Sequence, residues 1–293
     1  MTAMRGIFPQ AAGLSPAARP ASFSIQFAMT THWARHLRHW ELLGPPLRPH
    51  RDVVDRVLSL IGSGTTPCLL LGSTVEYAAL RSRVISVDAT FPMVAGLWRH
   101  GDPSRLGIQA DWTCMPIRPQ TFSHVLGDGS LNAIPWATLP LLFDEVRRVL
   151  QPRGILIARV FCRPETAETP EDIRRDVVRG RAGSFHALKW RVAMSMLGDE
   201  EQSDIAVKNI RRAVMAAYPD REELCRITGW VRAEVGTLDV YETSDAIYNF
   251  PTEAMIVALL RRWFAEVELV RCGTYPLAER CPVIVARDAL PTE

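Results

Sequence analysis

The sequence lacks the patterns that mark metal-binding, disulfide-stapled and membrane-spanning chains. None of its six cysteines belongs to a Cys-x-x-Cys pair, and a chain of 293 residues is too long and too poor in cysteine for a small secreted disulfide scaffold. Its apolar runs are short and interrupted by proline or charge, whereas a membrane-spanning helix needs about 20 apolar residues. We therefore expect free thiols, no bound metal, no membrane partner and a cytoplasmic location.

A strong charge of either sign is also missing. The chain has 34 Lys and Arg against 32 Asp and Glu, and it has no run of five or six basic residues. We therefore expect no nucleic-acid partner. The first 40 residues contain no acid, a composition similar to an organelle transit segment, but they have no uninterrupted apolar stretch of a secretory signal. We interpret residues 1–30 as a disordered extension; a start site placed upstream of the true one, near Met29, is the open alternative.

What the sequence does contain is a hydrophobic fraction of 47%, which is enough for one sizeable core. Short apolar runs, typical of strands buried on both faces, occur at 68–72, 84–88, 106–111, 122–126 and 155–161. Helical spacing of apolar residues occurs before and between them, at 52–61, 91–98 and 139–150. This alternation predicts an α/β fold with a doubly wound, Rossmann-like and mostly parallel sheet.

The second half of the chain predicts an insertion and an antiparallel end. Residues 163–235 interrupt the alternation and have a helical pattern punctuated by proline, which indicates an inserted helical cap. After a helix at 252–264, the runs 267–272 and 282–287 predict an antiparallel hairpin at the sheet edge, so that the last strand is antiparallel. The predicted domains are the extension 1–30, a Rossmann-like domain over 31–162 and 236–293, and the cap 163–235.

Polar residues gather at the carboxyl ends of the predicted strands, where doubly wound sheets bind their ligands. They are Gly72, Ser73, Thr74 and Glu76 after the first strand, Asp88 after the second, Asp111 and Trp112 after the third, and Asp128 and Gly129 after the fourth. A carboxylate at the position of Asp88 can accept hydrogen bonds from both hydroxyls of a ribose. Asp111 can accept from the amine of an adenine while the Trp112 ring stacks on the base.

This order of features resembles the class I S-adenosylmethionine (SAM)-dependent methyltransferases over residues 66–161 and 251–287. The segment Val149-Leu150-Gln151-Pro152-Arg153-Gly154 stands where that family shows a leucine and then Pro-Gly-Gly before the fifth strand. The resemblance implies that SAM is the cofactor and that the nine strand-end residues bind it. It also implies a chain that transfers a methyl group.

The first loop departs from the family pattern. Leu70 stands where the family has an acid inside the first strand, and Thr74 and Glu76 stand where its later glycines fall. Glu76 either meets the sulfonium or amino group of the methionine or only opens the next helix, where an acid favours the helix dipole. Similar structural alternatives apply to Asp88 and Asp128 as turn residues and to Trp112 as a core residue.

Residues for the methyl acceptor are expected in the insertion and just before the last helix, and the N-terminal segment offers a lid over the cofactor. Trp33, His36, His39, Trp40 and Arg48 form either a lid over the cofactor or one face of a helix. His186, Lys189 and Trp190 have the spacing of one helix face, either at the site or in a solvated basic surface. We nominate His186 as the catalytic base, and Lys189, Trp190 and Tyr248 as substrate-binding residues.

The sequence therefore predicts an enzyme that methylates a small molecule by in-line displacement, largely through alignment of the reactants. A catalytically silent methyltransferase fold, serving as a binding protein or partner subunit, is the alternative, because the first loop has lost its glycines. An NAD(P)-dependent oxidoreductase is disfavoured because no G-x-G-x-x-G follows the first strand. A nucleic-acid methyltransferase is disfavoured by the near-neutral charge and the lack of an Asn/Asp-Pro-Pro-Tyr motif.

Overall fold

The central element of the protein is a seven-stranded sheet with the order β3-β2-β1-β4-β5-β9-β8. The computed structural model describes residues 32–62, 67–80, 84–100, 102, 105–198 and 202–291; the predicted extension lies outside them. The strands are β1 (Cys68–Leu71), β2 (Val84–Asp88), β3 (Leu106–Gln109), β4 (Phe122–Asp128), β5 (Leu150–Arg159), β8 (Phe264–Val270) and β9 (Val283–Ala289). Strands β1 to β5 are parallel, whereas β9 is antiparallel to both β5 and β8. The predicted Rossmann-like sheet with an antiparallel end is confirmed.

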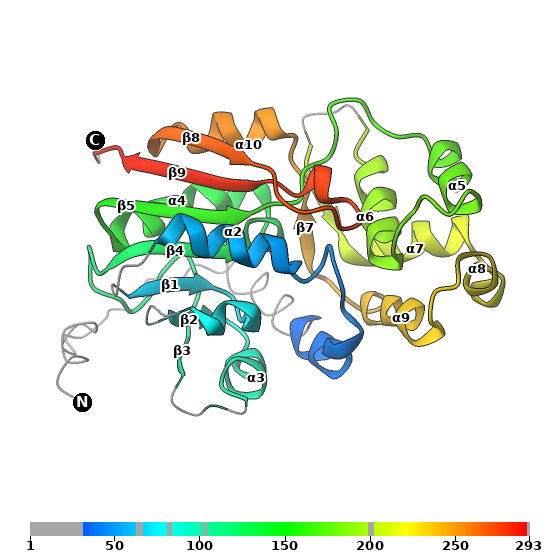
Figure 1. Cartoon of the computed structure of the whole chain (residues 1–293), viewed down its shortest axis with the longest axis horizontal. Coiled ribbons are helices and arrows are strands. Elements are labelled where there is room, and N and C mark those ends of the chain that lie inside the picture. The colour runs from blue at the N-terminus through cyan, green and yellow to red at the C-terminus, as the bar shows by residue number, and fades with distance from the viewer. Residues whose placement is uncertain are drawn as a thin grey trace.

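Helices cover both faces of this sheet (Figure 1). Helix α2 (Arg51–Ile61) packs on one face, and α4 (Leu139–Val149) and α10 (Glu253–Leu260) pack on the other. Alternate residues of β1 serve the two faces, since Leu70 belongs to the core cluster of α2 whereas Leu69 and Leu71 belong to that of α4. Each apolar side chain that is fully buried in these clusters stabilises the fold by roughly 1.5–3 kcal/mol.

Two elements differ from the sequence-based prediction. The helix expected at 91–98 is a short α3 (Phe91–Met93) that continues as a π-helical turn, Val94–Trp98. Strand β5 begins at Leu150, which pairs with Phe122, so the Pro-Arg-Gly turn lies inside the extended segment. Arg153 has a positive φ of 64° there, which lets the chain turn without leaving the strand. No described helix is long and apolar enough to cross a membrane.

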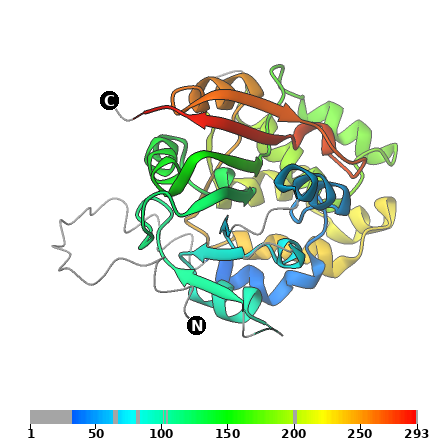
Figure 2. The same cartoon turned by 60° about the vertical axis from the view of Figure 1, so that its left-hand side comes forward.

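The insertion is helical, as the sequence indicates, and it lies at the end of the sheet where the parallel strands finish (Figures 1 and 2). Its helices are α5 (Pro170–Val178), α6 (Phe185–Ser195), α7 (Val207–Ala217), α8 (Arg221–Thr228) and α9 (Arg232–Gly236). It also contains a small antiparallel sheet of β6 (Asp204–Ala206) and β7 (Ile247–Asn249), which the sequence pattern did not predict. Because β7 pairs with β6, the packing of the insertion continues beyond residue 235.

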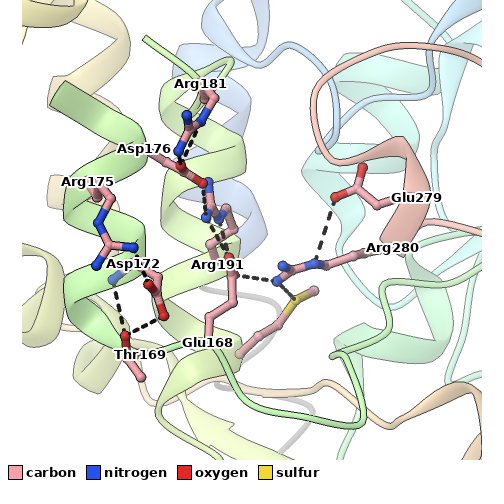
Figure 3. A network of polar contacts seen from close by, with 10 residues as sticks. Glu168, Thr169, Asp172, Arg175, Asp176, Arg181, Arg191, Glu279 and Arg280 are labelled. Atoms are coloured by element: carbon pink, nitrogen blue, oxygen red, sulfur yellow. Dashed lines mark hydrogen bonds and ion pairs between the residues drawn. The ribbon is translucent and has the colours of Figure 1, made fainter. Parts of the chain in front are cut away.

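An ion-pair network joins the insertion to the segment between β8 and β9 (Figure 3). Glu168 accepts hydrogen bonds from Arg191 of α6 at 3.1 and 2.5 Å, and it lies 2.7 Å from Arg280. Arg191 also binds Asp176 of α5 at 2.7 Å. Since the Arg191 side chain is only 8% exposed, this network is more strongly coupled than isolated surface pairs. It holds the insertion in place over the end of the sheet.

Candidate active site

A cavity of about 1140 Å³ opens at the carboxyl ends of β1, β2 and β4. Its volume is slightly above the roughly 300–1,000 Å³ of single-ligand pockets, so it has space for a cofactor and a small second ligand. All nine strand-end residues singled out in the sequence line it: Gly72, Ser73, Thr74, Glu76, Asp88, Asp111, Trp112, Asp128 and Gly129. The fold thus brings together residues that are up to 57 positions apart in the chain.

Asp88 lies at the end of β2, 8% exposed, on the cavity wall. Its Oδ1 accepts a hydrogen bond from the backbone N–H of Thr90 at 2.8 Å, which is the turn expected as the structural alternative. Its Oδ2 has a weaker contact, 3.4 Å from the Ser73 hydroxyl. Burial raises the pKa of Asp88 to about 6, although hydrogen bonds from Thr90 and Ser73 oppose that shift. The carboxylate is therefore ionised at neutral pH, with Oδ2 able to accept from a ligand.

Asp111 and Trp112 follow β3 and form the neighbouring part of the wall. Both hydrogen bonds of Asp111 go to its Oδ1, from the backbone N–H and the hydroxyl of Thr113 at 2.8 and 2.9 Å. The Trp112 indole donates to the Val87 carbonyl at 2.6 Å, which fixes the ring beside Gly72. A fixed indole next to an acid suits a planar base with an exocyclic amine.

The backbone conformation of the loop after β1 shows why the later glycines of the family pattern are not needed here. Gly72 has a φ of 101°, which only glycine adopts readily, so the first glycine of the family pattern is required here. The chain then enters a 3₁₀ turn, Val75–Ala79, whose N-cap Thr74 has an ordinary φ of −73°. Because residues in that turn have negative φ, Thr74 and Glu76 need not be glycine.

Glu76 connects this loop to the N-terminal segment. Its Oε1 accepts a hydrogen bond from Arg48 Nε at 2.6 Å, while its Oε2 is buried without a hydrogen-bond partner among the described residues. Both residues line the cavity. Glu76 also stands in the first turn of the 3₁₀ segment, so the two interpretations of this acid are compatible. A buried carboxylate oxygen without a partner is costly, and a hydrogen bond from a cationic ligand group would remove that cost.

Asp128 at the end of β4 is bound by an arginine that the sequence analysis did not single out. Arg159 donates to Asp128 through Nε at 2.5 Å and through Nη2 at 3.0 Å, and both side chains are almost fully buried. The signal in the sequence is an arginine inside the apolar run 155–161, since a buried arginine requires an acidic partner. Asp128 therefore contributes a neutralised carboxylate to the wall.

Gly129 follows Asp128 with a φ of 65°, and a Cβ there would lie 2.7 Å from Phe161 Cε2. Phe161 itself lines the cavity. The turn therefore requires glycine both for its backbone conformation and for the close approach of the Phe161 ring.

The N-terminal segment lines one side of the cavity. It consists of a helical turn at 32–36 and a 3₁₀ helix, Leu37–Leu42. Trp33, His36, Trp40 and Arg48 line the cavity, as a lid would, whereas His39 does not. Several hydrogen bonds join the segment to the insertion and the strand after it, including one between His32 Nε2 and the Tyr248 hydroxyl at 2.7 Å and one from His186 Nε2 to the Leu42 carbonyl at 2.9 Å.

The four residues nominated for the acceptor divide into two groups. Trp190 and Tyr248 line the cavity, whereas His186 and Lys189 do not. All four are buried: His186, Lys189 and Trp190 because α6 is covered by protein on almost every side, and Tyr248 within β7. Burial, with help from the charge of Lys189, lowers the pKa of His186 to about 3. That His186 acts as a base stays a prediction. Its Nε2 is bonded to the Leu42 carbonyl of the N-terminal segment.

Comparison with known proteins supports the Rossmann-like fold and identifies one domain within the chain. Residues 62–158 match the family model described as a methyltransferase domain. A search of curated proteins found no match.

Among the described residues, no group of three or more His, Cys, Asp or Glu side chains is placed to hold a metal ion.

Two solved structures are similar over most of the chain. One is the 1,6-didemethyltoxoflavin-N1-methyltransferase of Burkholderia thailandensis, with S-adenosylhomocysteine bound: 13% identity, TM-score 0.54, covering 95% of this chain and 94% of that one. The other is named a putative Zn-dependent alcohol dehydrogenase, from Rhodobacter sphaeroides: 16% identity, TM-score 0.58, covering 89% and 98%. At these identities the likeness concerns the fold.

Proposed function

Because the chain contains a class I SAM-dependent methyltransferase domain of Rossmann-like fold, we propose that it transfers the methyl group of SAM to a small molecule. One observation supports this most strongly. A single cavity has the strand-end residues of a nucleoside site on one side and an enclosing wall from the lid and the insertion on the other. A concave cavity of this kind suits a small acceptor better than a nucleic acid or a protein surface.

The residues present fit SAM at three places. Asp88 Oδ2 would accept from the ribose hydroxyls, since only its Oδ1 is committed to the backbone. Trp112 and Asp111 would hold the adenine. Glu76, whose Oε1 is bonded to Arg48, would accept from the methionine ammonium once its buried Oε2 turns toward the cavity, next to the backbone of Gly72, Ser73 and Thr74. Asp128 and Gly129, fixed by Arg159 and Phe161, would shape the wall between the two ligands.

When bound, SAM supplies a methyl group on a positively charged sulfur, which needs no metal to leave. The chain's own residues then have three tasks. Gly72, Asp88 and Trp112 orient the cofactor, and the lid residues Trp33 and Trp40 exclude water from the reacting atoms. Trp190 and Tyr248 orient the acceptor, while His186 and Lys189 lie behind them as the basic groups nominated from the sequence.

Calorimetric titration of S-adenosylhomocysteine (SAH) and NADPH into the wild-type chain and into Asp88→Asn tests the proposal. We expect wild type to bind SAH and not NADPH. The variant should bind SAH roughly 10- to 100-fold more weakly, since a hydrogen bond to a charged group contributes about 1.5–3 kcal/mol. Asp55→Asn, on the exposed face of α2, is the matched control and should bind like wild type. If SAH gives no heat, the alternative of a catalytically silent methyltransferase fold is favoured. If Asp88→Asn binds SAH as tightly as wild type, Asp88 is not part of the site.

A further inference from the structure

The acceptor side of the cavity is an almost continuous surface of rings. We define the aromatic wall as Trp33, His36, Trp190, Tyr241, Tyr248 and Phe250, all of which line the cavity. The rings contact one another, with centroid separations of 5.7 Å for His36 and Tyr241, 5.5 Å for Trp190 and Tyr248, and 5.2 Å for Trp190 and Phe250. Such a surface favours a flat ligand that stacks on or packs edge-on against rings.

The charges around the cavity are divided between its two sides. The lining acids are Glu76, Asp88, Asp111 and Asp128, all at the strand ends, and the aromatic wall contains none. A charged group behind the wall is Lys189, whose Nζ lies 4.6 Å from the Tyr241 ring centroid and 5.3 Å from that of Trp190; the carboxylate of Glu234 offsets part of its charge. Among the described residues this Nζ has no hydrogen-bond partner. A cation already occupies the outer faces of these rings, so the wall repels a cationic acceptor and favours an anionic one.

Among the imidazoles near the wall, His36 is the one placed to take a proton from a ligand. His32 uses both ring nitrogens, with the Tyr248 hydroxyl at 2.7 Å and the Ser244 hydroxyl at 3.0 Å. His186 is bonded to the lid and does not line the cavity. His36 lines the cavity and is 1% exposed, but its Nδ1 is buried with no partner among the described residues, so the ring must turn for this nitrogen to meet a ligand.

The surroundings of His36 keep its ring neutral. Burial is the main cause that holds its pKa well below the usual 6.5, and the nearby His32, Lys189, His186 and His39 act in the same direction. No carboxylate contributes to this shift. A neutral ring has a free lone pair at neutral pH, but the same surroundings make it a weak base, so the negative charge left on the acceptor depends on Lys189.

We propose that the aromatic wall receives a planar aromatic acceptor with an acidic O–H or ring N–H group, that His36 takes the proton of that group, and that Lys189 balances the negative charge. This inference rests on the proposed function and specifies its substrate class. Lys189 acts as a positioning residue, since it lies behind the wall. His36 replaces His186 as the group in contact with the acceptor.

The step balances without any further reactant. The acceptor's oxygen or nitrogen forms a bond to the methyl carbon, and the bond from that carbon to the sulfonium sulfur breaks, with its electron pair left on the sulfur. The acceptor's proton goes to the His36 imidazole, which then releases it to water when the lid opens. The products are the methylated acceptor, SAH and one proton.

The test uses the SAH-loaded chain and two flat probe molecules, one that can form an anion and one that is a cation at neutral pH. One is 7-hydroxycoumarin, whose absorption spectrum distinguishes the phenol from the phenolate, and the other is tryptamine, an ammonium at neutral pH. At a pH where the free phenol is mostly protonated, we expect the bound probe to have a phenolate-to-phenol ratio roughly tenfold higher, because a nearby positive charge lowers a phenol pKa by one or more units. Tryptamine should bind at least tenfold more weakly than the phenol.

Three variants assign the effect to residues. His36→Gln and Lys189→Met should each lose most of the rise in phenolate. His39→Gln, three residues along the same segment and outside the cavity lining, should keep it. SAH affinity is measured for every variant, because a variant that still binds SAH has kept its fold. If His36→Gln loses SAH affinity, three measurements still test the inference. They are the wild-type spectrum, the comparison with tryptamine and the spectrum of the phenol bound to Lys189→Met.

The outcomes separate this inference from the proposed function. Failure of wild type to bind SAH removes the proposed function, and the inference falls with it. Normal SAH binding together with a bound phenol that stays protonated, a phenol that does not bind, or tryptamine binding as tightly as the phenol overturns the inference alone. A full phenolate signal in His36→Gln assigns the proton to another group and overturns the role of His36.

Discussion

Replacement of Lys189 by methionine should make the protein more stable, by an amount that depends on pH. The Lys189 side chain is fully buried among aromatic rings, and its Nζ has no hydrogen-bond partner among the described residues. Methionine has nearly the same length and is apolar, so it fills the same space without a charge. The variant therefore isolates the energetic cost of placing an ammonium group at this position.

The magnitude follows from the pKa of the amine. Burial lowers the pKa of Lys189 from 10.5 to about 7, although Glu234 opposes the shift. At about 1.36 kcal/mol per pKa unit, the charged form costs on the order of 5 kcal/mol in the folded state. Below about pH 7 the folded protein holds the charge and the whole cost is present. Between pH 7 and 10.5 only the unfolded chain binds the proton, so wild-type stability rises with pH through that range.

Urea denaturation at pH 6 and pH 9 measures this difference. We expect the gain in unfolding free energy of Lys189→Met to be about 3 kcal/mol larger at pH 6 than at pH 9, where about 2 kcal/mol of the cost remains. Lys208→Met, at a half-exposed lysine paired with Asp245, should change stability by no more than about 0.5 kcal/mol at either pH. An equal gain at both pH values, or a loss at pH 6, would refute the claim that burial of the Lys189 ammonium costs more than Glu234 and the surrounding rings offset.

Three further predictions concern the cofactor side. SAH should bind more weakly as the pH falls through about 6, because protonation of Asp88 removes an acceptor for the ribose; calorimetry from pH 7.5 to 5 would show a flat profile if Asp88 had no such role. Glu76→Gln should weaken SAH roughly tenfold but leave methylthioadenosine, which lacks the amino-acid end, unchanged; equal losses for both ligands would contradict the assignment. Gly129→Ala should destabilise the protein by about 2–4 kcal/mol in urea melts, from a positive φ and a clash with Phe161. Gly229→Ala, with the same backbone conformation in open space, should cost only about 1–2 kcal/mol, and similar losses at both glycines would exclude the clash.

The parallel half of the fold was predictable because buried strands and amphipathic helices have different periods. The run at 84–88 is β2 to the residue, since its five residues are all buried and Asp88 ends it. The same rule gathered the nine strand-end residues at one cavity, because parallel strands end at one edge of a sheet. The two strands β6 and β7 were not predicted, since three residues each are too few to show a period.

The acceptor side was harder to predict for a physical reason. Helical spacing groups His186, Lys189 and Trp190 on one face of α6, but it left open whether that face lies at the site or in solvent. Since α6 is buried over residues 185–194, its pattern does not tell which side meets a cavity. The contact of Arg48 with Glu76, and that of Arg159 with Asp128, join residues 28 and 31 positions apart. Such pairs depend on the closed tertiary structure and not on local spacing.

The most direct test of the account is a crystal structure of the chain with SAH. The account predicts the ribose hydroxyls within hydrogen-bonding distance of Asp88, the adenine against Trp112, and the amino group of the homocysteine moiety at Glu76. It also predicts that the sulfur points toward the rings of Trp190 and Tyr248. A nucleoside bound elsewhere, or a cavity that side chains fill when SAH is present at saturating concentration, would contradict it.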